Sequence, residues 1–392
     1  MSEDVFIVAA KRTALGSFNG SLSKVEAPQL GATAIKAALE QSGVKADEVD
    51  ECIMGNVLTA GVGQAPARQA LIYAGLPSKV PCMTINKVCG SGLKAVMLGF
   101  DSIKLGNSSV VIAGGQENMS KAPHLLKGSR DGFKMGDTKL IDSMINDGLW
   151  DPYNDFHMGT AAEMCVKKYK FSREEQDAFA TNSYKKSQKA IEEGLFNEEI
   201  AAVEIKSRKD TITIDQDEEP ARVKFDKISK LRAVFEKEGT ITAANASTIN
   251  DGAAAFCLAS ESKVKALGLK PLAKIKAHST FAGDPEWFTT APSAAMKNLL
   301  DKEGLTSQDI DLWEINEAFS AVTMAAAKDL EIPEEKINVN GGAVSIGHPI
   351  GASGARILTT LVYALKQRNK KLGVASLCIG GGEAVAVLVE RV

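Results

Sequence analysis

The sequence predicts an α/β fold built from two related halves, and three features of the chain support this prediction. Short apolar segments typical of strands alternate with helical stretches towards both ends. Short motifs of the first part return in the same order at an offset near ~260 positions, as expected for a duplicated domain. A more polar segment separates the two parts.

The elements of each half follow from the period of their apolar residues. In the first half we expect buried strands at Val5–Ala10, Glu51–Val57 and Ser109–Ala113, and helices at Leu30–Gln41 and Leu93–Lys104. In the second half we expect strands at Lys274–His278, Leu312–Asn316, Gly373–Ile379 and Ala384–Val389, and helices at Ala294–Lys302 and Gly354–Lys366.

Glycine-rich helix starts are the clearest sign of duplication. Gly90-Ser91-Gly92-Leu93-Lys94 matches Ala352-Ser353-Gly354-Ala355-Arg356, and each is followed by a strand that ends in glycines, Ala113-Gly114-Gly115 or Ile379-Gly380-Gly381-Gly382. Two unrelated α/β units could share such motifs by chance. The steady offset between the copies favours duplication.

The segment between the halves differs from both in composition. We expect a first half at 1–120 (completed by about 249–270), an inserted loop domain at 121–248 and a second half at 271–392. The insertion contains a helix at Arg173–Glu193 that begins with a Ser-x-x-Glu capping box. Insertions of this size commonly cover or complete a site that the scaffold builds.

The composition is that of an ordinary soluble globular enzyme, with 44% apolar residues, 24% charged residues and a net charge of −3. This balance argues against nucleic acid as a partner, since phosphate binding needs a dense cationic face. No apolar run reaches the ~18 residues of a membrane span, and neither a signal peptide nor a Ser-Lys-Leu address is visible. We therefore expect a cytoplasmic protein with no membrane partner, although loss of a transit peptide would leave a similar chain.

Six cysteines in 392 residues do not form a disulfide framework, and the four histidines lack zinc spacing, so we expect no metal site. Cys52, Cys165 and Cys257 lie among apolar neighbours and are expected to be inert core residues. The sequence leaves Cys82 undecided. Cys89 and Cys378 lie in unusual places.

Cys89 lies immediately before the first glycine-rich helix start, in Asn86-Lys87-Val88-Cys89-Gly90-Ser91-Gly92. Unpaired backbone N–H groups and the positive end of the helix would favour a thiolate there. A buried cysteine at a tight strand–helix turn is an equally good reading of this motif alone.

His348 precedes the second copy of that helix start, in Gly347-His348-Pro349-Ile350-Gly351. A lone histidine in a turn is more often structural than catalytic. Here, pseudo-twofold packing of the halves would bring the two helix starts together. A cysteine and a histidine from different halves are an arrangement that nucleophilic acyl transfer uses.

Cys378 ends a buried strand, with Gly380-Gly381-Gly382 beyond it to expose backbone N–H groups. A nucleotide-binding loop is a weak alternative, because a strand rather than a helix follows the glycines. Glu314-Ile315-Asn316-Glu317-Ala318-Phe319 puts polar side chains at another strand end, where α/β proteins build sites.

Together these motifs resemble the blocks of the thiolase family, and the likeness runs essentially from end to end. The resemblance implies two thiolase-type α/β halves in a five-layered α-β-α-β-α arrangement, with an inserted loop domain that binds CoA. It implies Cys89 as nucleophile, His348 as its activator and thioester-oxygen donor, and Cys378 as acid/base. Asn316 would hold a water in one oxyanion site, and the N–H groups of Cys89 and Gly380 would form the other.

The His-Met pair in His157-Met158-Gly159-Thr160 resembles the acetoacetyl-CoA type of thiolase. By resemblance, Ser247 and His157 would contact the pantetheine arm of CoA, and Arg222 its adenine or phosphate. Residues expected to line the tunnel or acyl pocket are Leu149, Met158, Phe235, Phe288 and Phe319. Core packing is the alternative role for the four tunnel residues other than Phe288. Glu383 departs from the family pattern and could shift the pKa of Cys378.

The resemblance implies an acetyl-CoA C-acetyltransferase that joins two acetyl-CoA molecules into acetoacetyl-CoA and CoA, with no cofactor and no metal. A degradative 3-ketoacyl-CoA thiolase of broader chain length is the alternative enzyme. A non-catalytic acyl-CoA carrier would be expected to have lost a reactive group. The polar segment around Lys127–Lys139 suggests a homotetramer, with a dimer as the alternative.

Overall fold

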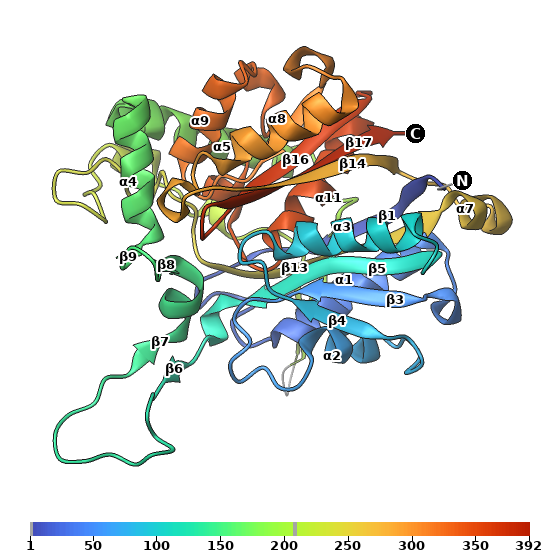
Figure 1. Cartoon of the computed structure of the whole chain (residues 1–392), viewed down its shortest axis with the longest axis horizontal. Coiled ribbons are helices and arrows are strands. Elements are labelled where there is room, and N and C mark those ends of the chain that lie inside the picture. The colour runs from blue at the N-terminus through green and yellow to red at the C-terminus, as the bar shows by residue number, and fades with distance from the viewer. Residues whose placement is uncertain (1–2, 207–209) are drawn as a thin grey trace.

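A computed structural model of the protein describes residues 3–206 and 210–392. One large sheet runs through it, with strands in the order β15-β16-β17-β14-β1-β13-β5-β3-β4 (Figure 1). The strands of this path are β1 (Val5–Thr13), β3 (Glu51–Gly55), β4 (Cys82–Ile85), β5 (Val110–Asn118), β13 (Asn250–Ser260), β14 (Ala273–Ala282), β15 (Leu312–Ile315), β16 (Leu372–Ile379) and β17 (Glu383–Arg391).

The pairing of the strands repeats between the halves. In the first, β3 and β5 are parallel, and β13 and β1 follow as antiparallel neighbours. In the second, β15 and β16 are parallel, and β17 and β14 follow in the same way. The two units join where β1 pairs antiparallel with β14, from Val5↔Ile275 to Ile7↔Ala273. This matched order is the structural form of the repeat in the sequence.

Helices divide the molecule into five layers. Helices α1 (Ala27–Ser42) and α2 (Pro66–Tyr73) pack on the outer face of the first unit, and α8 (Ala291–Glu303) packs on that of the second. Between the units lie α3 (Ser91–Lys104) and α11 (Ser353–Gln367), whose apolar residues share one core with strands of both halves (Figure 1). This α-β-α-β-α arrangement confirms the predicted fold class.

Two strands differ from the prediction, one in its length and one in not having been predicted. Strand β5 continues through Gln116, Glu117 and Asn118, because each of these polar residues pairs with β13. Strand β13 itself is buried at every position and had not been predicted as a separate strand. Both strands run next to the turns that carry the candidate site residues, so their polar ends become important below.

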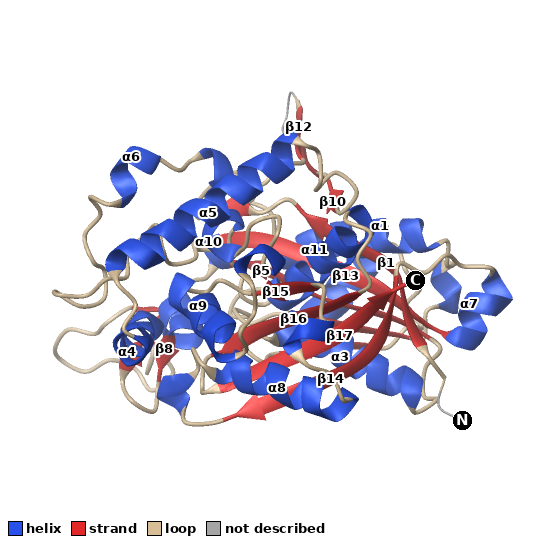
Figure 2. Cartoon of the chain, turned by 90° about the horizontal axis from the view of Figure 1, so that it is seen from above, coloured by secondary structure: helices blue, strands red, loops and turns tan. Residues whose placement is uncertain are grey.

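The segment between the halves lies beside the second unit. Its helices α4 (Met158–Tyr169) and α5 (Arg173–Glu192) pack against α9 (Ser320–Asp329), as seen from above in Figure 2. An arm that begins and ends in β6 (His124–Leu125) and β7 (Ile141–Asp142) projects away from the rest of the protein (Figure 1). Within 3–206 and 210–392, no helix is long and apolar enough to cross a membrane.

Candidate active site

The starts of α3 and α11 meet in the middle layer, as the repeat predicted, and each follows a turn with an unusual backbone. Val88, directly before Cys89, has φ 46°, which is strained for a β-branched residue. Gly347, directly before His348, has φ 115°. A side chain at Gly347 would also collide with Asn250, whose nearest atom would lie 2.4 Å from an added Cβ. Glycine is therefore required at this turn.

A cavity of about 200 Å³ lies where these turns meet the end of β16. It brings together Cys89, His348, Cys378 and Gly380 from the predicted catalytic set. The predicted binding residues that line it are Leu149, His157, Met158, Ser247, Phe235, Phe288 and Phe319. Residues from both halves and from the segment between them thus form one mostly apolar chamber.

Two predicted residues lie outside the lining of this cavity. Asn316 is fully buried behind it, and its amide nitrogen lies 3.4 Å from Nδ1 of His348. The amide oxygen of Asn316 has no hydrogen-bond partner within the described part of the chain. Arg222 is exposed on the segment after the short helix Glu219–Ala221 and does not reach the chamber, so its contact with CoA stays a prediction.

The hydrogen bonds of His348 define its orientation. Its Nδ1 lies 2.6 Å from Oγ of Ser353, and that hydroxyl donates to the carbonyl of Pro349 at 2.9 Å. Because the single hydroxyl proton is used in this way, Nδ1 is the donor to Ser353, and Nε2 is left as an acceptor. Burial, with a smaller contribution from the charge of Arg356, lowers the pKa of His348 to about 3. His348 is therefore a neutral base at neutral pH.

Both cavity cysteines are thiols in the free protein, which corrects the expectation that the helix start would make Cys89 a thiolate. Loss of solvent around its sulfur raises the pKa of Cys89 to about 12, although the N–H groups of Gly380 and Cys89 itself donate to the sulfur and oppose this shift. Burial, followed by the nearby Cys89, raises the pKa of Cys378 well above its ordinary value. Desolvation outweighs the favourable helix end at Cys89.

Glu383 does not act on Cys378 as the sequence had suggested. Burial, Cys89 and Cys165 are the influences that raise the pKa of Cys378. The Glu383 carboxylate instead forms an ion pair with Lys87.

Two buried residues for which no role had been predicted hold the His348 turn. Glu117, at the end of β5, accepts hydrogen bonds from the backbone N–H groups of Val57, Leu58 and Gly351. Burial raises the pKa of Glu117 to about 7, and these donors oppose that shift. Asn250 accepts the N–H of His348 at 2.9 Å. Glu117 lies near the end of β5, and Asn250 begins β13, and both strands belong to the first unit of the sheet. Their side chains therefore fix a turn of the second half across the interface between the halves.

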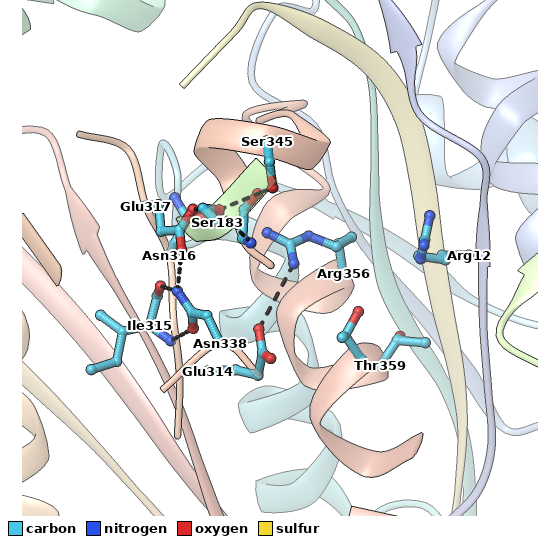
Figure 3. Close-up of polar contacts among 12 residues, drawn as sticks. Arg12, Ser183, Glu314, Ile315, Asn316, Glu317, Asn338, Ser345, Arg356 and Thr359 are labelled. Carbon is cyan, nitrogen blue, oxygen red and sulfur yellow. Dashed lines mark hydrogen bonds and ion pairs between the residues drawn. The ribbon is translucent and has the colours of Figure 1, made fainter. Parts of the chain in front are cut away.

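A second polar layer supports the strand end that carries Asn316 (Figure 3). The side chain of Asn338 donates to the carbonyl of Ile315 and accepts its N–H, at 2.8 and 2.9 Å. Glu317 accepts from Asn338 and from the hydroxyl of Ser183. Further along, the fully buried carboxylate of Glu314 lies 3.9 Å from the guanidinium of Arg356, the charge that contributes to the low pKa of His348 (Figure 3). Ile315 and Glu317, the residues on either side of Asn316, are therefore held by hydrogen bonds to neighbouring side chains.

Aromatic residues form part of the chamber wall. The ring of His157 stacks on Phe235 with 4.8 Å between centroids, and Nδ1 of His157 accepts the N–H of Gly159 at 3.0 Å. This bond leaves Nε2 of His157 as the donor of the neutral ring. Phe288 is 3% exposed and belongs to the apolar cluster that contains Met158 and Cys378.

The duplicated α/β scaffold and a shared chamber that brings Cys89, Cys378 and His348 together define the class of this protein. Residues 5–262 match the family described as thiolase, N-terminal domain, and residues 269–391 match thiolase, C-terminal domain. The chain belongs to the thiolase family.

Individual relatives cover the whole chain. It is 56% identical over 390 residues to the acetyl-CoA acetyltransferase of Cupriavidus necator, with 99% of each chain covered. It is 52% identical over 391 residues to that of Pseudomonas aeruginosa, with 99% of this chain and 100% of the relative covered. The crystal structure of the Bacillus anthracis acetyl-CoA acetyltransferase matches with a TM-score of 0.98 at 40% identity, covering 100% of this chain and 99% of that one.

Proposed function

We propose that this protein is an acetyl-CoA C-acetyltransferase, which reversibly joins two acetyl-CoA molecules into acetoacetyl-CoA and CoA. One observation carries the proposal: Cys89, Cys378 and His348 line the same small chamber, so a nucleophile, an acid/base and an activating base can act on one substrate. The names of full-length relatives at 50% identity and above support it.

The first half-reaction transfers an acetyl group to Cys89. Nε2 of neutral His348 takes the thiol proton as the sulfur attacks the thioester carbon, because the raised pKa of Cys89 prevents spontaneous ionisation. The N–H groups of Cys89 and Gly380 donate to the developing oxyanion. When the C–S bond to CoA breaks, the departing thiolate takes the proton of Cys378, which becomes a thiolate.

The second half-reaction forms the carbon–carbon bond. The Cys378 thiolate is a strong base because burial raises its pKa, and it removes a methyl proton from the second acetyl-CoA. Protonated His348 and a water held by Asn316 donate to the enolate oxygen. The enolate carbon attacks acetyl-Cys89, and the leaving Cys89 sulfur recovers its proton from His348. Both cysteines return to the thiol state, and no cofactor or metal is needed in this scheme.

The chamber favours a short acyl group, which separates this proposal from a 3-ketoacyl-CoA thiolase of broader chain length. Phe288 and Phe319 occupy space beside Cys378 with little exposure of their own, 3% and 8%. His157, Met158, Phe235, Ser247 and Leu149 are left to contact the pantetheine arm, with Arg222 proposed at the far, charged end of CoA.

A steady-state assay of thiolysis tests the choice between the two enzymes. We expect kcat/KM for acetoacetyl-CoA to exceed that for 3-ketohexanoyl-CoA and longer substrates by at least about 10²-fold, in line with the strict size limits of a packed pocket. A flat chain-length profile would favour the degradative enzyme. Absence of turnover with every substrate would favour a carrier of acyl-CoA.

Assembly and location are part of the proposal. The arm between β6 and β7 exposes large apolar side chains, Phe133, Met135 and Leu140, which supports a homotetramer built through this arm. The six cysteines of the described chain are unpaired, and the proposed reaction needs two of them as thiols. The free state of the cysteines and the need for two thiols in the reaction support a location of the protein in the reducing cytoplasm.

A further inference from the structure

An ion pair joins the turn that carries Cys89 to the end of the turn that follows Cys378 and strand β16. The ammonium of Lys87 contacts the carboxylate of Glu383, although the two residues are 296 positions apart. Lys87 lies two positions before Cys89, and Glu383 directly follows the Gly380–Gly382 turn. The side chains are 23% and 34% exposed, and neither lines the chamber.

The same loops touch again on the other side of Cys89. A Cβ at Gly90 would lie 2.3 Å from Cδ1 of Ile379, so these residues are in close contact. Ile379 is the register partner of Glu383 across the turn between β16 and β17. The Lys87–Glu383 and Gly90–Ile379 contacts therefore flank the place where the N–H of Gly380 reaches the Cys89 sulfur.

The turn before Cys89 has a strained backbone. Val88 has φ 46°, which a β-branched residue rarely adopts, whereas glycine accommodates the positive φ of Gly381 and Gly382, 92° and 84°, without strain. A strained conformation persists only where the surroundings hold it. On the Cys89 side, the N–H of Lys87 donates to the hydroxyl of Ser91 at the start of α3. Besides the packing of Gly90 on Ile379, two polar contacts tie this turn to the Gly380 turn: the N–H of Gly380 donates to the Cys89 sulfur, and Lys87 pairs with Glu383.

We propose that Lys87 and Glu383 are positioning residues that hold the Gly380 turn against the Cys89 turn, so that the N–H groups of Gly380 and Cys89 converge on the reacting centre. The proposal rests on the proposed function, in which these groups stabilise the oxyanion during transfer to Cys89. Because the pair lies outside the chamber, it affects the rate of transfer rather than the binding of substrate.

Three variants test the pair: Glu383→Gln, Lys87→Met and the exchange Lys87→Glu/Glu383→Lys. The matched control is Glu198→Gln, which removes a more exposed ion pair with Lys366, at 55% and 51% exposure. In rapid-quench mass spectrometry with acetyl-CoA, we expect each single variant to acetylate Cys89 about tenfold more slowly at unchanged KM. The charge exchange should recover most of the rate, and the control should match the wild type.

Hydrogen exchange of the substrate-free protein gives an independent measurement. Amides of the peptide containing Gly380–Gly382 should exchange faster in Glu383→Gln than in the wild type or the control. Wild-type acetylation in Glu383→Gln, or a charge exchange no better than the single variants, would overturn the proposal. So would a slower reaction with unchanged hydrogen exchange, since Glu383 would then act through its charge alone.

The two proposals fail in different ways. If acetyl-CoA does not acetylate the wild-type protein, the proposed function is wrong, whatever the variants do. If the wild-type protein is acetylated and Glu383→Gln equals it in the rate of acetylation and in hydrogen exchange, only the positioning role is wrong.

Discussion

Gly92 and Gly354 are equivalent positions of the repeat, and helices α3 and α11 cross where they lie. A Cβ on Gly92 would lie 2.8 Å from the backbone nitrogen of Ala355, and one on Gly354 would lie 2.4 Å from that of Leu93. Each glycine thus accommodates the backbone of the other helix. This crossing sets the separation between the turns that carry Cys89 and His348.

Gly354→Ala is expected to destabilise the protein and to slow acetylation of Cys89. The added methyl group meets backbone atoms, which cannot move aside as a side chain does, so we expect a loss of about 1–3 kcal/mol in the free energy of unfolding. Gly99→Ala in α3 is the matched control, since its Cβ would meet only side-chain atoms, the nearest at 3.0 Å. Urea unfolding at one protein concentration measures the stability of both variants. Equal stability of the two variants would contradict the role given to the crossing.

His348 is expected to make stability depend on pH between 7.5 and 5.5. Its pKa falls from 6.5 to about 3 in the folded protein, so the unfolded chain binds the proton first. The contribution of neutral His348 is therefore complete above pH 6.5 and is lost as the pH falls towards 3. From pH 7.5 to 5.5, the wild type should lose about 1.4 kcal/mol more than His348→Gln. An identical loss in both proteins, measured by urea unfolding, would mean that His348 is not held neutral.

Phe288→Ala is expected to broaden the range of acyl chains. Truncation opens space beside Cys378, so turnover of 3-ketohexanoyl-CoA should rise at least about tenfold relative to acetoacetyl-CoA. Phe171→Ala is the control, because Phe171 packs against the same apolar cluster without lining the chamber. Thiolysis of a chain-length series measures both variants. An unchanged profile in Phe288→Ala would place the size limit elsewhere.

The sequence predicted seven of the nine strands along the main path of the large sheet and four of the five helices that form the layers, because apolar periodicity marks elements that face a buried core. It did not predict the full length of β5, whose last residues are polar. Gln116, Glu117 and Asn118 are buried all the same, since their backbone pairs with β13 and the carboxylate of Glu117 serves several N–H donors. No local pattern distinguishes such a strand end from a loop.

Within the site, motifs and the family resemblance predicted 11 of the 17 residues that line the chamber, but not the residues that orient His348. The bond from His348 to Asn250 spans 98 positions, and that from Gly351 to Glu117 spans 234. Partners this far apart leave no spacing to recognise. The protonation of Cys89 was also beyond the sequence, because the loss of solvent that raises its pKa depends on residues from both halves.

The central claim is that Cys89 acts as the nucleophile and Cys378 as the acid/base. Variants of each cysteine can separate these two roles. Cys165→Ala is the matched control, because Cys165 is buried in the same apolar cluster as Cys378 but does not line the chamber. It should keep acetylation and condensation alike. Cys89→Ala should lose both.

The most direct measurement is intact-protein mass spectrometry of Cys378→Ala after incubation with acetyl-CoA in deuterated water. We predict that Cys378→Ala gains one acetyl group on Cys89, forms no acetoacetyl-CoA and does not exchange the methyl protons of acetyl-CoA with solvent. Acetylation should proceed more slowly than in the wild type, since the proton for departing CoA must then come from solvent. A Cys378→Ala protein that is folded by its circular dichroism spectrum and remains unacetylated would contradict the account, as would one that still exchanges the methyl protons.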